Sequence, residues 1–150
     1  ILVDGQRTNG VELGAAGSIT PSWTVMGGYA YQDGRITNTL SATAKDGARL
    51  AQVPRHSFSL WNRYDVAPRL GIGAGVIHNA DMFTSTDNTV VLPSFTRVDG
   101  GLFVRFGRAL SAQVNVENLF DQRYYAFSNG NNNITPGAPR AVRIALTTRF

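Results

Sequence analysis

Apolar and polar side chains alternate along most of this 150-residue chain, and no long segment repeats with the period of a helix. Strict alternation places every second side chain on the same face of a strand, so it predicts β structure. We predict seven strands, at residues 11–19, 23–32, 55–65, 70–79, 95–106, 110–119 and 141–150. Most are close to the roughly 9–11 residues that a tilted strand needs to cross a lipid bilayer.

The connections between these strands alternate between short and long. Residues 20–22, 66–68 and 107–109 form short turns, whereas residues 33–54, 80–94 and 120–140 form long loops. Barrels of bacterial outer membranes have short periplasmic turns and long extracellular loops. The pattern therefore predicts a membrane barrel with its C-terminus at the periplasmic end, and a soluble sandwich gives no reason for loops sorted in this way.

The charged side chains of the predicted strands all share the face opposite the apolar one. Arginine or lysine facing lipid at the middle of a bilayer costs about 2–4 kcal/mol, so we expect lipid on the apolar face and a lumen on the charged face. The charged residues are Glu12, Arg55, Arg63, Asp65, Arg97, Asp99, Arg105, Glu117, Arg143 and Arg149. The polar exceptions on the apolar face, predicted near strand ends, are His56, Asn62, His78 and Asn118.

Two further features distinguish a membrane barrel from a half-buried soluble sheet, which also has one apolar face. The outward aromatic residues Trp23, Tyr64, Phe106 and Phe150 fall at predicted periplasmic strand ends, as one half of an aromatic girdle does. The opposite face is small, polar and rich in glycine, which suits a lumen. We therefore expect an all-β fold, an antiparallel transmembrane β-barrel segment of about seven strands.

Seven strands do not close a bacterial barrel, because single-chain bacterial barrels have even strand numbers from 8 upward. An open sheet of seven would leave two unpaired edges in lipid. The chain opens with Ile1, without an initiator methionine or a signal peptide. We therefore expect further strands upstream of Ile1.

Composition argues against several functions. The net charge is +4 and the pI about 10.0, but the basic residues form no run or stripe, so nucleic acid is not expected as a partner. The chain has no cysteine and no apolar run of the roughly 18 residues that a membrane helix needs. No serine or carboxylate pair with a positioned histidine supports an enzyme, and we interpret His56 and His78 as interfacial rather than metal-binding.

Several segments, in order and spacing, resemble the siderophore-binding members of the TonB-dependent receptors. Residues 7–13 resemble the strand pattern R-x-x-G-x-E, and residues 53–57 the start of the next strand. Residues 92–99 resemble L-P-x-Y-T-R-x-D, and residues 115–125 resemble N-V-x-N-L-F-D-x-x-Y-Y. Residues 136–140 precede a last strand that ends in Phe150, which resembles the terminal signature read by the barrel assembly machinery, although Thr148 departs from it.

This resemblance implies a barrel of about 22 strands around a plug domain, of which residues 1–150 are the C-terminal part. It implies active uptake of ferric siderophores, with the plug and the TonB box in a missing N-terminal part through which TonB acts. The loop at residues 129–137 resembles catecholate receptors. The expected partners are the ferric siderophore, TonB, the barrel assembly machinery and outer-membrane lipid, with no covalently bound cofactor.

The candidate site residues follow from this interpretation. We expect ligand contacts from three residues of the outer loops, Arg35, Tyr124 and Tyr125. We expect ion pairs on the lumen wall, in contact with the plug, from Arg63, Arg97, Asp99, Arg105, Glu117 and Arg143. A route for an anionic ligand along these arginines is the sharper alternative. A passive porin or other small barrel remains the second hypothesis for the whole chain, and a soluble β domain the third.

Overall fold

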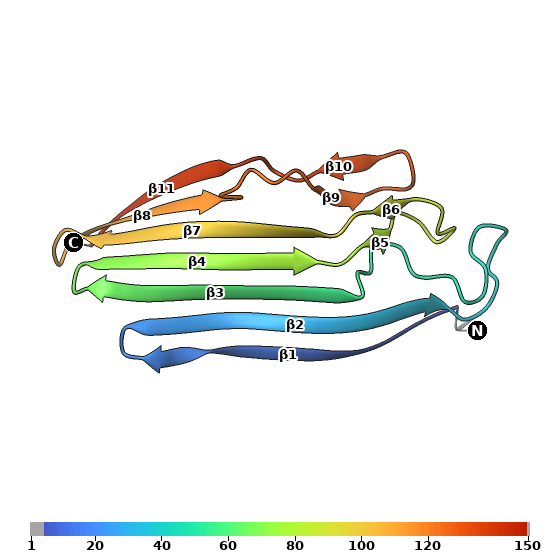
Figure 1. The fold of residues 1–150 in the computed structure, drawn as a ribbon, viewed down its shortest axis with the longest axis horizontal. Helices are drawn as coiled ribbons and strands as arrows, with labels where there is room; N and C mark the ends of the chain where they lie inside the picture. Colours follow the sequence, from blue (N-terminus) through green and yellow to red (C-terminus); the bar gives the residue numbers. More distant parts are fainter. Residues whose placement is uncertain (1–4, 150) are drawn as a thin grey trace.

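The computed structural model describes residues 5–149, and seven long strands form one continuous antiparallel sheet. They are β1 (Gln6–Thr20), β2 (Trp23–Ile36), β3 (His56–Ala67), β4 (Leu70–Asn79), β7 (Phe95–Arg105), β8 (Leu110–Glu117) and β11 (Ala141–Thr148). Figure 1 shows them side by side in the order of the chain. Within the described residues, no helix is long and apolar enough to cross a membrane.

All connections between neighbouring long strands fall at one of two ends of the sheet. Tight turns join β1 to β2, β3 to β4 and β7 to β8 at one end, called here the turn end (Figure 1). The long loops at residues 37–55, 80–94 and 118–140 meet at the other, called the loop end. Two small hairpins lie within these loops, β5 (Met82–Phe83) with β6 (Val91–Leu92) and β9 (Tyr125–Ser128) with β10 (Ile134–Pro136).

The predicted strands are all present, and the largest differences lie at the loop end of the first two. The fourth predicted strand has the same bounds as β4, and the third, fifth, sixth and seventh differ from theirs by one or two residues at an end. β1 begins five residues earlier than predicted and β2 ends four residues later, because Gln6 to Gly10 pair with Gln32 to Ile36. The last predicted residue, Phe150, lies outside the described residues.

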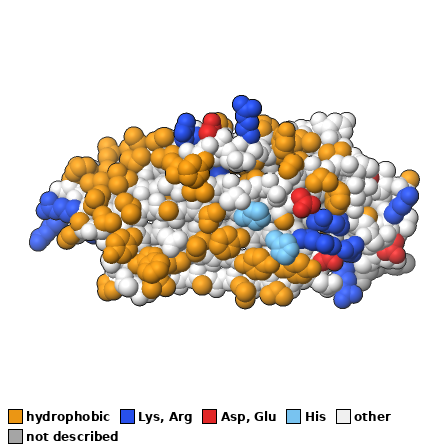
Figure 2. Space-filling model, in the orientation of Figure 1, with side chains coloured by type: hydrophobic (Ala, Val, Ile, Leu, Met, Phe, Trp, Pro, Cys, Tyr) orange, Lys and Arg blue, Asp and Glu red, His pale blue; other side chains and the backbone are white. Residues whose placement is uncertain are grey.

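The register confirms the predicted apolar face. One row of paired residues across five strands runs Leu13, Tyr29, Phe58, His78 and Thr96. This face is open, with Leu13, Ile144 and Leu146 each 65–70% exposed. Figure 2 shows it, with apolar side chains spread over the strands and both histidines among them. Exposed apolar rows of this extent are those that lipid covers in a membrane barrel.

Aromatic residues mark the turn end of the apolar face, as predicted. Trp23 of β2 pairs directly with Tyr64 of β3, and Tyr64 pairs with Ile72 of β4. The Trp23 indole Nε1 donates to Asn62 Oδ1 at 3.2 Å. Asn62 lies further from the strand end than we predicted, and this hydrogen bond satisfies its polar group there.

The longer β1 and β2 change one prediction. Arg7, Asp33 and Arg35 lie on the extensions at the loop end, with the same alternation as Tyr29 and Tyr31, and so on the apolar side of the sheet. The expectation that no charge falls on this side fails at these extensions. Arg55, which we predicted on the opposite face, precedes β3 and pairs with Asp33 at 3.3 Å. Their position beyond the apolar rows puts them at the margin of the lipid, where water and headgroups solvate charge.

The opposite face is less uniformly small and polar than predicted. Trp61 of β3 and Phe103 of β7 lie on it, over a floor of glycines. A Cβ built on Gly73 would lie 2.6 Å from Trp61 Cζ2, and one on Gly101 would lie 3.2 Å from Phe103 Cε2. The glycines therefore create the space in which the two aromatic rings lie flat against the wall.

Among the described residues, the buried apolar side chains lie at the loop end, at the last residue of β2 and in the hairpin of β5 and β6. Ile36, Met82 and Leu92 are 1%, 7% and 1% exposed, and all three lie at the loop end. The polar side chains Thr84 and Ser128 are also buried there, at 2% and 3% exposure. Burial is therefore concentrated at the loop end.

Candidate functional site

Hydrogen bonds join the three long loops to one another at the loop end. The Asn88 side chain accepts from Arg49 N at 2.8 Å and donates to Arg49 O at 2.9 Å, which fixes the first loop to the second. Gln52 N donates to Phe83 O at 2.9 Å, and the Gln52 side chain accepts from Ser128 N at 3.2 Å. Because Gln52 touches both other loops, the three pack as one unit.

Asp87 and Asn131 form a second link, between the middle and last loops. Asn131 Nδ2 donates to Asp87 Oδ2 at 2.7 Å and to Thr89 Oγ1 at 3.1 Å. The Ser85 hydroxyl and the Thr89 backbone N–H also donate to Asp87, and these bonds hold the pKa of its carboxyl at about 2, below its ordinary value of 3.8. Asp87 is therefore an anionic acceptor at every pH above about 4.

Arg97 and Asp99 form a half-buried ion pair where β7 enters the loop end. Arg97 Nη2 donates to Asp99 Oδ2 at 2.9 Å, with side-chain exposures of 22% and 16%. Asp99 Oδ1 accepts from Asn118 N at 2.8 Å, and the Asn118 amide bonds Gln122 and Ala138. Asp99 thus holds both the arginine and the turn that begins the last loop.

Tyr124 lies beside this arginine. Arg97 Nη1 donates to the Tyr124 hydroxyl at 3.3 Å, and the Tyr124 ring stacks on Phe95 with centroids 4.3 Å apart. Gly137 lies directly against the Tyr124 ring, which leaves no room for a Cβ. Arg97 Nε is buried without a partner in the described residues, so a polar donor remains unsatisfied next to two aromatic rings.

A hollow of about 460 Å³ opens next to Tyr124. Its lining comes from both sides of the last loop: Asp121, Gln122, Arg123, Tyr124, Tyr125, Pro136, Gly137 and Pro139. Aromatic rings with arginine nearby suit a ligand that is both planar and anionic. The strand arrangement therefore gathers the chemistry for such a ligand at the loop end, around β7, β8 and the last loop.

The three predicted ligand residues are divided between two places. Tyr124 and Tyr125 line the same hollow. Arg35 lies at the end of β2, where its Nε donates to Asp33 Oδ2 at 3.1 Å and its Nη1 to Gly47 O at 3.1 Å. β3 and β4 stand between β2 and β7 in the sheet, so Arg35 does not join the two tyrosines.

The six predicted wall residues all lie on the face opposite the apolar rows. The structure groups them as separate local contacts rather than one continuous network. Arg97 pairs with Asp99, Arg143 pairs with Glu117 across two strands at 3.3 Å, and Arg63 pairs with Asp65 at 3.1 Å. Arg105 Nη2 instead donates to Pro68 O at 2.6 Å. Arg63 also lies over the Phe103 ring, 4.2 Å from its centroid.

Sequence reasoning placed Arg97 and Asp99 among the ion-paired wall residues but missed the contact of Arg97 with Tyr124 and the aromatic rings on the wall. Asn118 and Asp121 both have positive φ, at 53°, a conformation in which asparagine and aspartate are enriched. Their presence three residues apart was therefore a signal for the turn that positions Tyr124. The glycines Gly73, Gly75 and Gly101 were a weaker signal for the position of the Trp61 ring. They lie around this ring only when the strands are paired, and the sequence alone does not give that pairing.

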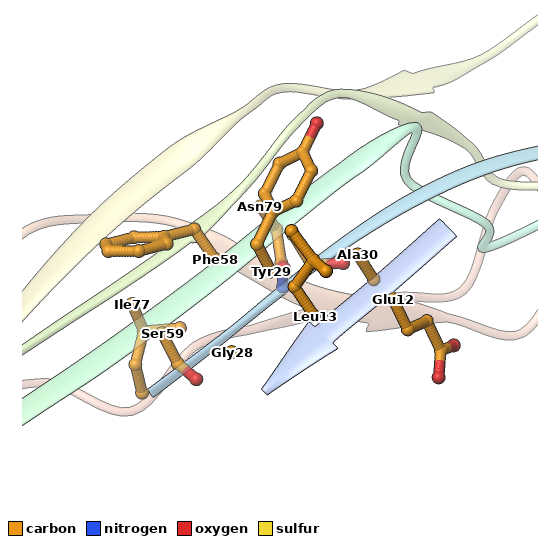
Figure 3. A pocket seen from close by; sticks show the side chains of 10 residues that line it. Glu12, Leu13, Gly28, Tyr29, Ala30, Phe58, Ser59, Ile77 and Asn79 are labelled. Atoms are coloured by element: carbon orange, nitrogen blue, oxygen red, sulfur yellow. The ribbon is translucent and has the colours of Figure 1, made fainter. Parts of the chain in front are cut away.

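The inner face is also hollowed between β1 and β4. A hollow of about 310 Å³ is lined by Glu12, Leu13, Gly28, Tyr29, Ala30, Ser57, Phe58, Ser59, Ile77 and Asn79. Figure 3 shows Glu12 and Ser59 on one side of the strands, with Leu13 and Tyr29 on the other. A second hollow of about 390 Å³ adjoins it through Gly28, Ser59 and Ile77, and reaches Trp61 and Asp99.

The two histidines bond neighbouring side chains on the apolar face. His56 Nδ1 lies 2.8 Å from the Tyr29 hydroxyl, and His78 Nδ1 lies 2.9 Å from Thr96 Oγ1. In the part of the chain that the structure describes, no group of three metal-ligating side chains is found. Their surroundings are those of polar side chains at the edge of an apolar band.

Residues 1–119 match the family model described as TonB dependent receptor-like, beta-barrel. The chain belongs to the TonB-dependent receptor family. These are receptors and transporters of the bacterial outer membrane rather than enzymes, as the sequence indicated. In an outer-membrane barrel the apolar face contacts lipid, the opposite face lines the lumen, and the long loops are extracellular.

Curated relatives and solved structures agree with this membership. The chain is 35% identical over 150 residues to the catecholate siderophore receptor Fiu of Escherichia coli K12, covering 97% of this chain and 20% of Fiu. It is 39% identical over 129 residues to the probable TonB-dependent receptor BfrD of Bordetella pertussis, covering 80% of this chain and 17% of BfrD. It therefore spans about a fifth of the length of these relatives.

The fold agrees with solved TonB-dependent receptors. The siderophore receptor PiuA from Acinetobacter baumannii superposes with a TM-score of 0.88 at 28% identity, covering 96% of this chain and 22% of PiuA. The closed form of the ferric-catecholate import receptor Fiu superposes with a TM-score of 0.87 at 33% identity, covering 97% and 21%. The seven-stranded sheet therefore corresponds to part of the barrel in these larger receptors.

Proposed function

We propose that this chain is the C-terminal part of the barrel of an outer-membrane receptor that imports ferric siderophores with energy transmitted by TonB. The plug domain and the TonB box belong to a part of the receptor that precedes these residues. The barrel assembly machinery inserts the strands, with Phe150 as the signal. Full-length relatives of this kind, named as siderophore receptors, support the proposal.

We also propose that the ligand is of the catecholate class. The observation that carries this is the group formed by Arg97, Tyr124 and Phe95 beside the 460 Å³ hollow. Ferric catecholates combine flat aromatic rings with negative charge, so rings that stack and a guanidinium with a buried unsatisfied donor complement both properties. In the complete receptor, Tyr124 and Tyr125 contact the ligand from the extracellular side.

Replacement of Tyr124 by alanine is expected to weaken binding of iron(III) tris-catecholate to the complete receptor about tenfold, because one stacking partner and the contact to Arg97 are lost. Tyr124→Phe keeps the stacking on Phe95 and is expected to lose less. Quenching of receptor fluorescence on titration measures both. Tyr64→Ala, on the lipid side of the turn end, is the control and is expected to bind as the unmodified receptor does.

Two outcomes would contradict separate parts of the proposal. Unchanged affinity in Tyr124→Ala would remove this site from ligand binding, and equal affinity for an iron(III) trihydroxamate would remove the catecholate class. Uptake that continues in cells without TonB would instead favour the passive porin. The affinity measurements test the binding site and the ligand class, whereas the uptake assay tests whether the receptor depends on TonB. A negative result at Tyr124 therefore does not decide whether the protein is a TonB-dependent receptor.

A further inference from the structure

We propose that Asn129 is a site of spontaneous covalent modification, where the side-chain amide converts to aspartate and isoaspartate and thereby loosens the last long loop from the other two. The residue lies in the turn between β9 and β10, at the loop end of the molecule (Figure 1). The reaction uses only the chain and water, so the proposal does not depend on the ligand proposed for the hollow beside Tyr124.

The sequence contains two asparagines that are followed by glycine, in Asn9-Gly10 and Asn129-Gly130. In such a pair the backbone nitrogen of the glycine attacks the asparagine Cγ, because glycine has no side chain to hinder the approach. The new N–Cγ bond closes a succinimide ring, the backbone nitrogen gives up its proton, and the side-chain nitrogen leaves as ammonia. Water then opens the ring at either carbonyl, which yields aspartate or isoaspartate.

The structure leaves Asn129 and Gly130 free to react. The Asn129 side chain is exposed, and in the described part of the chain neither this side chain nor the Gly130 N–H has a hydrogen-bond partner. The chain bends at these two residues, and Gly130 has a φ of 90°, so the backbone has already left the extended conformation. A Cβ built on Gly130 would meet nothing within 4 Å, so the surrounding space is open.

The second asparagine–glycine pair is restrained by the sheet. Asn9 and Gly10 lie within β1, where they pair with Asp33 and Gln32 of β2. Asn9 Oδ1 also accepts a hydrogen bond from Arg7 Nε at 3.2 Å. Ring closure requires the backbone to leave the extended conformation, so reaction at Asn9 must wait for these strand pairs to open. The two sites share a sequence, and the fold favours reaction at Asn129.

Asn129 lies between two contacts that join the last long loop to the others. On one side, Ser128 N donates to Gln52 Oε1 at 3.2 Å, and on the other, Asn131 Nδ2 donates to Asp87 Oδ2 at 2.7 Å. Isoaspartate adds a methylene to the main chain between these two donors, which shifts them relative to their acceptors. Both products also add a carboxylate close in sequence to the amide that binds the anionic Asp87. We therefore expect the modified loop to pack less firmly.

The chemical step is tested by incubating the complete receptor in water enriched in heavy oxygen, followed by tryptic digestion in ordinary water and tandem mass spectrometry. Cleavage after arginine places the two pairs in separate peptides, residues 8–35 and 124–140. Heavy oxygen marks only the conversion that occurred during the incubation. We expect conversion at Asn129 to be at least about tenfold faster than at Asn9, because the strand pairs protect Asn9. Equal rates, or conversion at residues 131–133 in place of Asn129, would overturn the proposal.

Hydrogen–deuterium exchange tests the effect on the loop. After the incubation, we expect the amides of residues 125–136 to exchange at least about threefold faster than in fresh receptor, and those of β4 to be unchanged. Asn129→Gln keeps the amide but needs a larger ring, which closes far more slowly, so this variant is expected to retain the fresh exchange rates. Unchanged exchange in the converted receptor would overturn the loosening of the loop, as would an equal increase in Asn129→Gln.

Discussion

Replacement of Asp99 by asparagine is expected to lower the unfolding free energy of the complete barrel by about 1–3 kcal/mol, the range for leaving a buried hydrogen-bonding group without its partner. The Arg97 side chain is only 22% exposed and its Nε already lacks a partner, so loss of the carboxylate leaves a half-buried charge uncompensated. The asparagine amide keeps only one acceptor oxygen, so either Arg97 Nη2 or Asn118 N then faces an NH2 group instead of an acceptor. Thermal unfolding, followed by the shift between folded and unfolded bands on an unheated gel, measures the effect.

Asp65→Asn provides the matched control for this variant. Arg63 and Asp65 are also two residues apart on one strand and on the same face, but their side chains are 40% and 34% exposed. Solvent screens such a pair, so its removal is expected to change the unfolding free energy by about 0–1 kcal/mol. Equal destabilisation in the two variants would contradict the view that Asp99 organises the mouth of the barrel.

The second large effect is expected where Trp61 lies on glycine. Alanines at both Gly73 and Gly75 would place Cβ atoms against the indole, at 2.6 Å from Cζ2 in the case of Gly73. Overpacking of this kind costs roughly 1–3 kcal/mol at each site. We therefore expect the double variant to unfold at a clearly lower temperature, with the indole displaced from the wall into the lumen.

A double-mutant cycle separates this clash from the intrinsic effect of losing glycine. In a Trp61→Ala background the ring is absent, so the same two alanines are expected to cost little, and the effects are strongly non-additive. Gly17→Ala with Gly100→Ala, where a Cβ meets nothing within 4 Å, is the control in the unmodified background. Additive effects in the cycle would show that Trp61 does not lie on these glycines.

The strands of the sheet could be predicted well because apolar and polar side chains alternate along the whole membrane-spanning part of a strand. Apolar side chains alternate from Leu70 to Val76 in β4 and from Val142 to Leu146 in β11, so the bounds of β4 agree and those of β11 differ only at its last two residues. This alternation gives no signal where β1 and β2 extend beyond the apolar rows. Arg7, Asn9, Asp33 and Arg35 continue the pairing of β1 and β2, but polar side chains on both faces carry no period.

The loop end could be predicted only in part. Alternation gives no signal in strands as short as β5 or β10, and the buried side chains Ile36, Met82 and Leu92 belong to three different strands. The family-like block around Asn118 pointed to Tyr124 and Tyr125 but not to Arg97 and Phe95, which precede it by more than 20 residues. The partners of Tyr124 depend on β7 and β8 being neighbours, which only the fold supplies.

The loops share buried side chains and mutual hydrogen bonds, so the hollow beside Tyr124, where we propose that the ligand binds, is already formed by the packed loops. Thr84 and Ser128 are buried between loops, and Ser128 Oγ donates to Thr84 O at 3.4 Å. A preformed site loses less conformational entropy when it binds. The packing of the three long loops against one another therefore explains how they hold the Tyr124 ring in position although they contain no long strand.

The central claim is that one face of this sheet contacts lipid while the other lines a lumen. The chain has no cysteine, so single cysteines can carry spin labels at consecutive positions of β8. In the receptor reconstituted in lipid, we expect labels at Ala112, Val114 and Val116 to collide with oxygen, and labels at Ser111, Gln113 and Asn115 with a water-soluble relaxing agent. Accessibility to the water-soluble agent at all six positions, without alternation, would contradict the claim.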